Sequence, residues 1–570
     1  MQFVLRDPSP RRVHSLQGAG IHPLLARLLA ARGVGEPAQA HPRLGDLLPP
    51  TLLLHADAAA VALADAIAQG QRLCVVADYD CDGATACAVA LRGLRMLGAR
   101  VGYLVPNRFT TGYGLSPAVV DLVARQSGEP VDWIVTVDNG IASLDGVRRA
   151  HELGMRVLIT DHHLPGAQLP PADVIVNPNQ PGCPFPSKNL AGVGVMFYVL
   201  LELRAELRRR GRFDSASQPR LDALLDLVAL GTVADVVPLD ANNRLLVAEG
   251  LRRMREGRMQ PGVRALFAAA GRDAAQAGSF DLGFALGPRI NAAGRLADMT
   301  VGIECLSTDD ASRALELAQA LDAINRERRG IEQRMREQAE AALRPLREQP
   351  AARASICLCS ADWHEGVVGI VAGRLKELHH RPTFVFAPGG DSQLRGSGRS
   401  IEGFHLRDAL DLVSKREPGL LLRFGGHAAA AGCTIAADGF ERFARAFEAV
   451  AEQGLSPELL ARRLEVDGEL DAQWYDVQTA ALLQQQVWGQ GFAPPLFASD
   501  IEVLQQSQFG NGHLRARVRA ARAGDAVREL VAWNRNDFLP QRARVAWRLE
   551  ANTWQGRSTP RMVLQAIEQS

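Results

Sequence analysis

The sequence of 570 residues is short of lysine and has almost no net charge. Its three lysines are Lys188, Lys376 and Lys415, so nearly all of the positive charge is carried by arginine. A net charge of +1 excludes a global basic field, and any nucleic-acid contact must therefore come from local groups of arginines. The arginine bias reflects either genome composition or phosphate binding, for which the planar guanidinium is well suited.

The sequence also lacks paired cysteines and long apolar runs. The eight cysteines include no Cys-x-x-Cys pair and no spacing typical of a disulfide framework, so we expect free thiols in a reducing compartment. No run of about 18 apolar residues is present, and no membrane span is predicted. The opening residues, MQFVLRDPSPRR, lack the apolar segment of a signal peptide. We therefore predict a cytoplasmic location.

The chain does contain a repeated alternation of short apolar runs and helical stretches. After a Pro- and Gly-rich lead-in, the runs LCVVA, WIVTV, VLIT and VIVN alternate with helical segments, which predicts a parallel sheet covered by helices. Residues 308–348 predict a long linker helix, with a helix packed inside one domain as the alternative. A second α/β unit follows. The alternating runs HLRARVRA, ARVAWRLE and MVLQAI then predict a small antiparallel barrel.

Acidic residues follow three of the predicted strands, at the point where each strand ends. LCVVA leads into Asp78, Asp80 and Asp82; WIVTV leads into Asp138; and VLIT leads into Asp161-His162-His163. Another candidate, Asp235, follows the run LVALGTVA. Because ligands of open parallel sheets bind outside the carboxyl ends of the strands, we expect these side chains to converge on one crevice.

Clustered carboxylates repel one another unless positive charge lies among them. Carboxylates with one or two imidazoles suit Mn²⁺ or Mg²⁺, and two such ions about 3.5–4 Å apart can activate water and hold both oxygens of a phosphoryl displacement. The alternative is that each acid caps a helix, a role for which Asp161 is well placed. Three clusters together, one with paired histidines, favour a two-metal phosphodiesterase.

Nine motifs in order resemble the DHH phosphoesterase family, and within it the exonucleases that are specific for single-stranded DNA. They are VVADYDCDGATA, PNRFTTGYGL, TVDNG, DHH, GTVADVVPL, GPRINAAGR, WHEGVVGIVAGRL, GSGRS and GGHAAAAG, spanning roughly residues 70 to 435. The resemblance implies an α/β fold with a DHH-type parallel-sheet domain, a smaller DHHA1-like domain joined by a long helix, and an OB-like barrel. The expected domains are residues 1–50 (lead-in), 51–306 (DHH), 307–348 (linker helix), 349–454 (DHHA1-like) and 455–570 (OB-like).

The resemblance also implies which residues bind metal and take part in catalysis. His163 is expected to face the scissile phosphate, with Asp138 and Asp80 as further catalytic residues. The cofactor is expected to be two ions of Mn²⁺, or of Mg²⁺. The implied metal ligands are Asp78, Asp80, Asp82, Asp138, His162 and Asp235.

A second implied group contacts the substrate. Asn291 and Arg295 fit the same cleft but can instead brace the linker, and the glycine-rich segment can be simple loop geometry. In GSGRS, two hydroxyls and a guanidinium are expected in one short loop that reads a 5′-phosphate. The implied substrate-binding residues are Arg108, Arg289, Asn291, Arg295, Ser397, Arg399, Ser400, Gly425, Gly426 and His427.

The predicted barrel resembles an OB-like module, which binds single strands through a basic groove and aromatic stacking. Trp488, Phe492 and Phe497 are candidates for stacking, with a structural core as the alternative. The Gly-Asn-Pro stretch that the family usually has near residue 490 reads Gly-Gln-Gly-Phe-Ala-Pro in this chain.

By this resemblance the predicted function is a 5′→3′ exonuclease that degrades single-stranded DNA to mononucleotides in recombination and repair. Single-strand-binding protein and a RecQ-type helicase are the implied protein partners. The alternative is a hydrolase of short oligonucleotides, cyclic dinucleotides or pyrophosphate, but such enzymes lack a long C-terminal module. A further alternative is a non-enzymatic role, because some relatives of this fold have lost their metal ligands. All six implied ligands are present in this sequence, which argues against that role.

Overall fold

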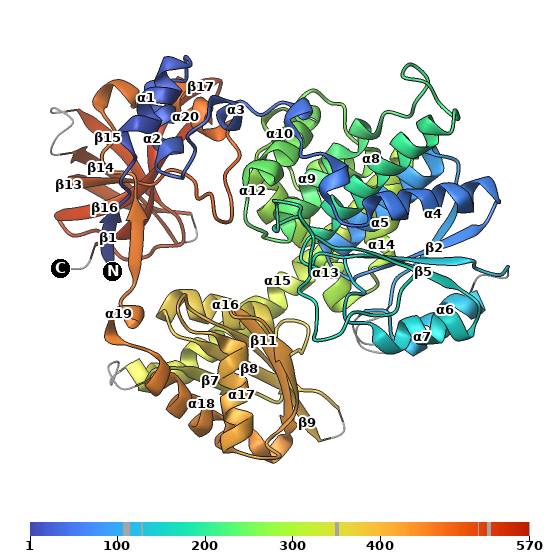
Figure 1. The fold of residues 1–570 in the computed structure, drawn as a ribbon. Coiled ribbons are helices and arrows are strands. Elements are labelled where there is room, and N and C mark those ends of the chain that lie inside the picture. Colours follow the sequence, from blue (N-terminus) through green and yellow to red (C-terminus); the bar gives the residue numbers. More distant parts are fainter. Residues whose placement is uncertain are drawn as a thin grey trace. The chain divides into compact units, whose positions relative to one another are not determined.

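The computed structural model describes residues 1–106, 114–126, 129–347, 353–390, 392–510, 512–520 and 526–568. These residues form two compact units (Figure 1). The larger unit contains residues 6–325 and 467–565. The smaller unit contains residues 1–5, 326–466 and 566–570. The helix α15 (Ala311–Arg347) runs through the boundary, which confirms the predicted long helix.

The centre of the larger unit is a five-stranded sheet in the order β3-β2-β4-β5-β6, in which every neighbouring pair is parallel. The middle strands are apolar and buried on both sides, as expected when helices cover both faces of a sheet. The strands are β2 (Arg72–Ala77), β3 (Arg100–Leu104), β4 (Trp133–Val137), β5 (Arg156–Thr160) and β6 (Val174–Val176).

The register of this sheet brings the three acidic clusters to one edge. Ala77 at the end of β2 pairs with Val137 at the end of β4, and Val137 pairs in turn with Thr160 at the end of β5. Asp78 and Asp138 therefore begin side by side beyond the carboxyl ends of their strands. Because β3 and β4 lie on opposite sides of β2, this edge also contains the crossover point at which ligands of such sheets bind.

Helices cover the two faces of the sheet with separate apolar clusters (Figure 1). One face packs on α6 (Pro117–Gln126) and α7 (Leu144–Glu152). The other face packs on a larger helical layer that forms the main core of the unit. The helices of that layer are α4 (Ala56–Ala68), α5 (Cys81–Met96), α8 (Gly192–Arg209), α9 (Leu225–Ala234), α10 (Ala241–Arg255), α11 (Pro261–Ala269), α12 (Ser279–Asp281), α13 (Gly287–Leu296) and α14 (Thr300–Ser307).

A closed barrel in the strand order β13-β14-β15-β17-β16 completes the larger unit. The prediction of an OB-like barrel is confirmed, but the expectation of an entirely antiparallel barrel was wrong, because β15 and β17 pair in parallel where the barrel closes. The strands are β13 (Phe497–Phe509), β14 (His513–Ala520), β15 (Val527–Ala532), β16 (Arg542–Trp554) and β17 (Arg557–Ile567), and the helix α20 (Val477–Gln484) precedes them.

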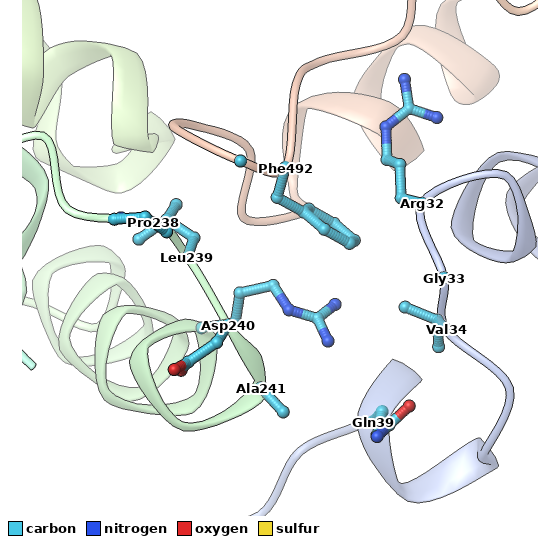
Figure 2. Close-up of a pocket in the computed structure, with 11 residues that line it drawn as sticks. Arg32, Gly33, Val34, Gln39, Pro238, Leu239, Asp240, Ala241 and Phe492 are labelled. Atoms are coloured by element: carbon cyan, nitrogen blue, oxygen red, sulfur yellow. The ribbon is translucent and has the colours of Figure 1, made fainter. Parts of the chain in front are cut away.

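The aromatic residues that were predicted to stack on bases lie in the protein core instead. Trp488 and Phe492 stack on each other and belong to the main apolar cluster of the larger unit, and Phe497 is fully buried. The alternative of a structural core is therefore the one that the structure supports, because neighbouring side chains cover these rings: Phe492 lies between Trp488 and Arg244, and Phe497 packs on Trp547. Figure 2 shows Phe492 held between the N-terminal segment and α10.

The lead-in is a helical segment that contacts the start of the barrel. It contains α1 (Pro10–Gly18), α2 (Pro23–Ala30) and α3 (Pro37–Ala40). Arg32 donates to both carboxylate oxygens of Asp467 at 2.8 Å, and its Nε donates to the carbonyl of Ala493. Both side chains of this ion pair are almost fully buried, so removing either one would leave a buried charge without its partner.

The smaller unit is built on a sheet in the order β10-β11-β9-β8-β7 with its own apolar cluster. The motif GSGRS was expected in a loop, but it forms the end of strand β9, where it pairs with β11. The elements are β1 (Gln2–Leu5), β7 (Ile356–Cys359), α16 (Val368–His379), β8 (Thr383–Pro388), β9 (Gln393–Arg399), α17 (Leu406–Arg416), β10 (Leu421–Gly426), β11 (Ala430–Ala436), α18 (Phe440–Gly454), α19 (Pro457–Leu460) and β12 (Arg463–Val466), which pairs with β1.

Two expectations from composition can be compared with the described residues. All eight cysteines are free thiols, as expected. None of the described helices is by itself long and apolar enough to cross a membrane; Leu44–Leu52 and Ala56–Ala68 meet the criterion only when joined across a bend of 84°.

Candidate metal centre

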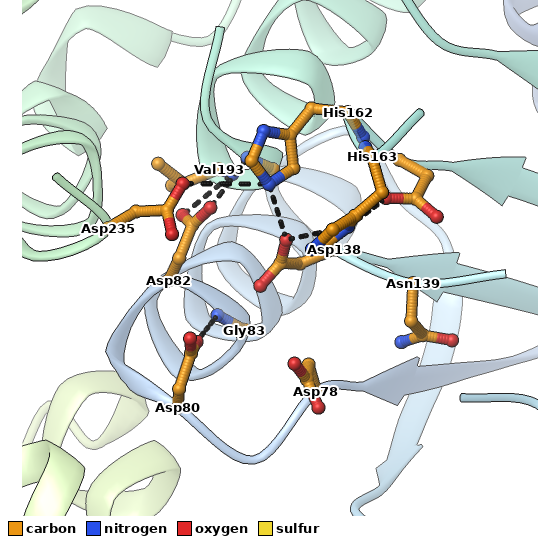
Figure 3. A network of polar contacts seen from close by, with 12 residues as sticks. Asp78, Asp80, Asp82, Gly83, Asp138, Asn139, His162, His163, Val193 and Asp235 are labelled. Atoms are coloured by element: carbon orange, nitrogen blue, oxygen red, sulfur yellow. Dashed lines mark hydrogen bonds and ion pairs between the residues drawn. The ribbon is translucent and has the colours of Figure 1, made fainter. Parts of the chain in front are cut away.

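Six of the predicted residues gather at the carboxyl edge of the parallel sheet (Figure 3). Three overlapping groups of possible ligands occur there; Asp138, His162 and His163 form one of them, and the other two contain the six predicted ligands. In the first of these two groups the ligand atoms of Asp82, His162 and Asp235 lie within 4.8 Å of one another. In the second group the same holds for Asp78, Asp80 and Asp138. Each group offers hard oxygen donors, and the first adds an imidazole, so the two groups suit two divalent ions.

His162 links the two groups. Its Nε2 lies 3.1 Å from Asp138 Oδ1 and 3.5 Å from Asp235 Oδ2. Both of these carboxylate oxygens are buried, and neither accepts a hydrogen bond from the described residues. A buried acceptor without a donor is costly unless a ligand completes it. The donor set therefore fits bound cations and supports the predicted ligand set.

The pKa values of the clustered acids also indicate a site for cations. Burial, followed by the charge of Asp80, raises the pKa of Asp82 to about 7. Burial, followed by the charge of Asp82, also raises the pKa of Asp138 and that of Asp235 well above the usual range. Without positive charge among them, these carboxyl groups are harder to ionise than ordinary aspartates. Bound divalent ions would favour ionisation, since the metal ligand is the deprotonated form.

Asp161 positions the second histidine of the tripeptide. Its carboxylate accepts hydrogen bonds from the amides of Ile141 and His162 and from Nδ1 of His163, the last at 2.8 Å. Burial opposes charge on His163, but the hydrogen bond and charge of Asp161 outweigh it and raise the pKa of His163 to about 9. Asp161 thus holds His163 as a cation whose side chain remains about a third exposed. The expected capping role of Asp161 is replaced by this orienting role.

The loop that carries Asp78 and Asp80 is held by contacts with α5 and with α13. Asp80 Oδ1 accepts from the amide of Gly83 at 3.0 Å and caps α5, so this acid is both a candidate ligand and a helix cap. The carbonyl oxygen of the Asn291 side chain accepts from the amide of Cys81 at 2.8 Å. A Cβ at Gly294 would lie 1.9 Å from the carbonyl oxygen of Tyr79, so only glycine allows α13 to approach this loop.

Asp138 has an unusual backbone conformation. Its φ is 61°, in the left-handed region that Asp and Asn tolerate better than most residues do. The side chain is held against the start of α8, where a Cβ at Gly192 would lie 2.5 Å from the Cβ of Asp138. The site therefore needs an Asp-like residue at position 138 and a glycine at position 192.

Sequence profiles of known families match three parts of the chain. They are the DHH family, N-terminal domain (residues 72–232), the DHHA1 domain (residues 352–453) and the RecJ OB domain (residues 466–566). The single-stranded-DNA-specific exonuclease RecJ of Salmonella typhimurium is 45% identical over 559 residues, which cover 96% of each chain. The RecJ of Escherichia coli K12 is 44% identical with the same coverage.

The chain belongs to the RecJ family.

Solved RecJ structures agree with this assignment. The structure of RecJ from Thermus thermophilus in complex with Mn²⁺ superposes with a TM-score of 0.81 at 30% identity, covering all of this chain and 79% of that one. A second structure, of exonuclease RecJ bound to manganese, has a TM-score of 0.58 at 36% identity, covering 72% of this chain and 97% of that one.

The predicted substrate residues near α13 lie in different surroundings. Arg289 is buried and donates to Asp322 on α15 at 3.0 Å and to the carbonyl of Ala285 at 2.6 Å. Arg289 thus braces the long helix, a role that had been considered for Asn291 and Arg295. Asn291 instead supports the metal loop, and Arg295 lies partly buried in the last turn of α13.

Ser397 and Arg399 lie together in the smaller unit, two positions apart on β9. Arg399 donates to the hydroxyl of Ser397 at 3.2 Å. A Cβ at Gly369 in the first turn of α16 would lie 2.8 Å from that hydroxyl, so both side chains face the start of this helix. No carboxylate of the described residues pairs with Arg399, and burial lowers its pKa. A partly buried cation beside a hydroxyl and a helix N-terminus is suited to a phosphate.

The other predicted substrate residues differ in how exposed they are. The Ser400 hydroxyl donates to the carbonyl of Phe404 at 2.6 Å and is buried, so it already has a structural role. Gly425, Gly426 and His427 are exposed at the turn of the β10–β11 hairpin. Arg108 lies outside the described residues. These substrate assignments stay predictions.

Two exposed aromatic groups were missed in the sequence. Phe280 and Phe284 stack at 4.7 Å just before α13 and are 54% and 62% exposed. On the barrel, Phe509, His513 and Trp533 form a second group, with Arg515 over Phe509 and Arg561 over Trp533. Nothing in the sequence distinguishes these rings from buried ones, because exposure depends on contacts between distant segments.

Proposed function

We propose that the chain is a single-stranded-DNA-specific exonuclease that acts from the 5′ end, releases mononucleotides and uses two divalent ions. The observation that carries the proposal is the pair of ligand groups around His162, with buried carboxylate oxygens of Asp138 and Asp235 that lack donors. When bound, Mn²⁺ or Mg²⁺ supplies the Lewis-acid charge that activates water and stabilises developing negative charge on a phosphodiester. The RecJ structures solved with Mn²⁺ and with Mg²⁺ support either ion as the metal.

The protein's own residues have distinct roles in this proposal. Asp78, Asp80, Asp82, Asp138, His162 and Asp235 hold the ions. His163, kept cationic by Asp161, stabilises negative charge on the phosphate and can give a proton to the leaving 3′-oxygen. Water forms the new bond to phosphorus, the bond from phosphorus to that 3′-oxygen breaks, and the remaining strand keeps a 5′-phosphate.

The polymer substrate is favoured over a small one by the C-terminal barrel. A RecJ OB domain profile matches residues 466–566, and the relatives with this name align along 96% of the chain. A hydrolase of cyclic dinucleotides or pyrophosphate does not need a domain that binds a single strand. A test uses single strands labelled at the 5′ or at the 3′ end, incubated with Mn²⁺. Labelled mononucleotide should appear at once from the 5′ label and last from the 3′ label; the reverse order would contradict the polarity.

We also propose that the aromatic and arginine group on the barrel binds the strand away from the cut end. Trp533 is 43% exposed, and it lies beside His513 at 5.0 Å between centroids. Arg515 and Arg561 place positive charge over the rings of this group. Stacking platforms with nearby cations are the usual means of binding single strands without sequence preference.

Trp533→Ala should weaken binding to a long single strand, since stacking contributes about 1–3 kcal/mol per base, or roughly five- to hundred-fold in Kd. Arg515→Ala should flatten the slope of log K against log salt by about 0.7 for each lost phosphate contact. Kd is measured on long and very short oligonucleotides over a salt series without metal, to prevent cleavage.

Trp554→Ala is the matched control, because Trp554 is 72% exposed on the same barrel outside this group. Equal effects of Trp533→Ala and Trp554→Ala would rule out the proposed strand contact. Point variants are needed because removing the whole C-terminal module from residue 455 onward would also remove Trp488 and Phe492 from the core of the larger unit.

Other aspects of the proposal rest on the family resemblance. We propose a cytoplasmic role in DNA recombination and repair, with single-strand-binding protein and a RecQ-type helicase as partners. Ser397, Arg399 and the start of α16 are proposed to bind the 5′-phosphate, together with Arg108.

A further inference from the structure

A cavity of ≈ 300 Å³ lies in the larger unit, apart from the metal centre (Figure 2). It is formed by the segment after α2, by the start of α10 and by the loop that precedes the barrel. Its walls are part apolar and part polar, and the polar residues are Arg32, Gln39, Asp240 and Arg244. The apolar lining includes Val34, Pro238, Leu239 and Phe492.

Arg244 is the unusual member of this cavity. The residue lines the cavity, is only 8% exposed, and has its guanidinium over the ring of Phe492. No acceptor or carboxylate among the described residues binds its guanidinium, and its Nε is buried without a hydrogen bond. Its one aromatic contact is with Phe492, whose ring centroid lies 4.1 Å away. Burial lowers the pKa of Arg244 to about 10, so it still carries its charge at neutral pH.

The helix that carries Arg244 makes this charge less favourable. Arg244 lies in the first turn of α10, a helix of 15 residues whose N-terminus is the positive end of its dipole. Ala241, the first residue of the helix, lines the cavity, and its amide has no acceptor among the described residues. Positive charge from two sources therefore meets in one cavity.

The nearby acid does not neutralise Arg244 by direct contact. Asp240 caps the helix by accepting from the amide of Asn243 at 2.9 Å, and its other oxygen accepts from the Ser187 hydroxyl at 2.6 Å. Asp240 also lines the cavity, but among the described residues no ion pair joins its carboxylate to the Arg244 guanidinium, and its charge acts on Arg244 only at longer range. By contrast Arg32, the other arginine of the cavity, is fully paired with Asp467.

We propose that this cavity binds a small oxyanion, a phosphate or carboxylate group carried on a compact apolar body. The guanidinium of Arg244 and the first amides of α10 bind the oxyanion, in the manner of anion sites at helix N-termini. Val34, Leu239 and the edge of Phe492 contact the apolar part. Both faces of Phe492 are already covered, by Trp488 and by Arg244, so the ligand does not stack on this ring.

The test measures binding of three probes to the full-length, metal-free protein by calorimetry: inorganic phosphate, thymidine monophosphate and 3-phenylpropionate. These probes separate a bare phosphate, a nucleotide and an apolar carboxylate as sources of the same chemistry. At least one should bind, and Arg244→Met, which keeps an apolar stem against Phe492, should weaken it about ten- to hundred-fold.

A second variant keeps the test decisive if Arg244→Met fails to fold. Ala241→Pro removes the first amide while suiting the helix start, and it should weaken the same probe severalfold. Arg252→Met, an exposed change on the same helix, should leave binding unchanged. Absence of binding by all three probes would overturn the proposal, as would equal binding by wild type and both Arg244→Met and Ala241→Pro. In that case Arg244 serves only to join α10 to Phe492.

Discussion

Asp138→Asn is expected to abolish hydrolysis of single-stranded DNA, with a loss in kcat of more than about a thousandfold, because several kcal/mol of metal-dependent stabilisation disappear. Asn is the informative replacement. Position 138 has φ 61°, which Asn tolerates, whereas Ala would add backbone strain unrelated to metal binding. Turnover is measured on a 5′-labelled single strand in saturating Mn²⁺.

The same variant should change how the stability of the metal-free protein depends on pH. Burial, followed by the charge of Asp82, raises the pKa of Asp138, so the folded state keeps a proton that the unfolded chain releases. The free energy of unfolding therefore falls as pH rises above the ordinary aspartate pKa of about 4. Asn cannot lose this proton, so Asp138→Asn should lose less stability than the wild type between about pH 5 and pH 8.

Thermal melts in EDTA and in Mn²⁺ separate the two effects. Mn²⁺ should raise the Tm of the wild type, because it binds the folded state, and should do so much less for Asp138→Asn. Asp145→Asn is the control, since Asp145 is exposed and pairs only with Arg148 in the first turn of α7. Turnover of Asp138→Asn close to the wild-type value would remove Asp138 from the ligand set.

Arg399→Ala is expected to reduce kcat/KM on strands with a 5′-phosphate about ten- to hundred-fold, and much less on strands with a 5′-hydroxyl. A charge-assisted contact to phosphate contributes roughly 1.5–3 kcal/mol, and this contact exists only for the phosphorylated end. Arg399 lies beside Ser397 and the start of α16 with no carboxylate partner among the residues that the structure describes, so its charge is available.

Two further variants test the geometry of this contact. Arg399→Lys keeps the charge but loses the planar fork, so it should recover only part of the preference for a 5′-phosphate. Arg416→Ala removes an exposed arginine in the last turn of α17 and should match the wild type on both substrates. Equal losses on the two ends would exclude Arg399 from the 5′-phosphate site.

The convergence of the acidic clusters at one edge of the sheet could be predicted from the sequence because it follows from local patterns. LCVVA, WIVTV and VLIT are buried parallel strands, and the acids that follow them must meet at one edge. The long helix and the strands of the barrel were equally visible, since helical and strand periodicity require only neighbouring residues. The order of nine motifs was also sufficient to indicate the family.

Contacts between distant segments could not be read from the sequence and were decided by the tertiary structure alone. Trp488 and Phe492 resembled a stacking platform, but packing against the helical layer buries them. Arg289 was expected to contact phosphate, but it pairs with Asp322 on α15. No sequence pattern singled out Arg244, which lies in a cavity where no carboxylate of the described residues pairs with it. The physical reason is that burial and pairing free energies depend on three-dimensional neighbours. Identical arginines and aromatic rings therefore become core, brace or binding site according to what folds against them.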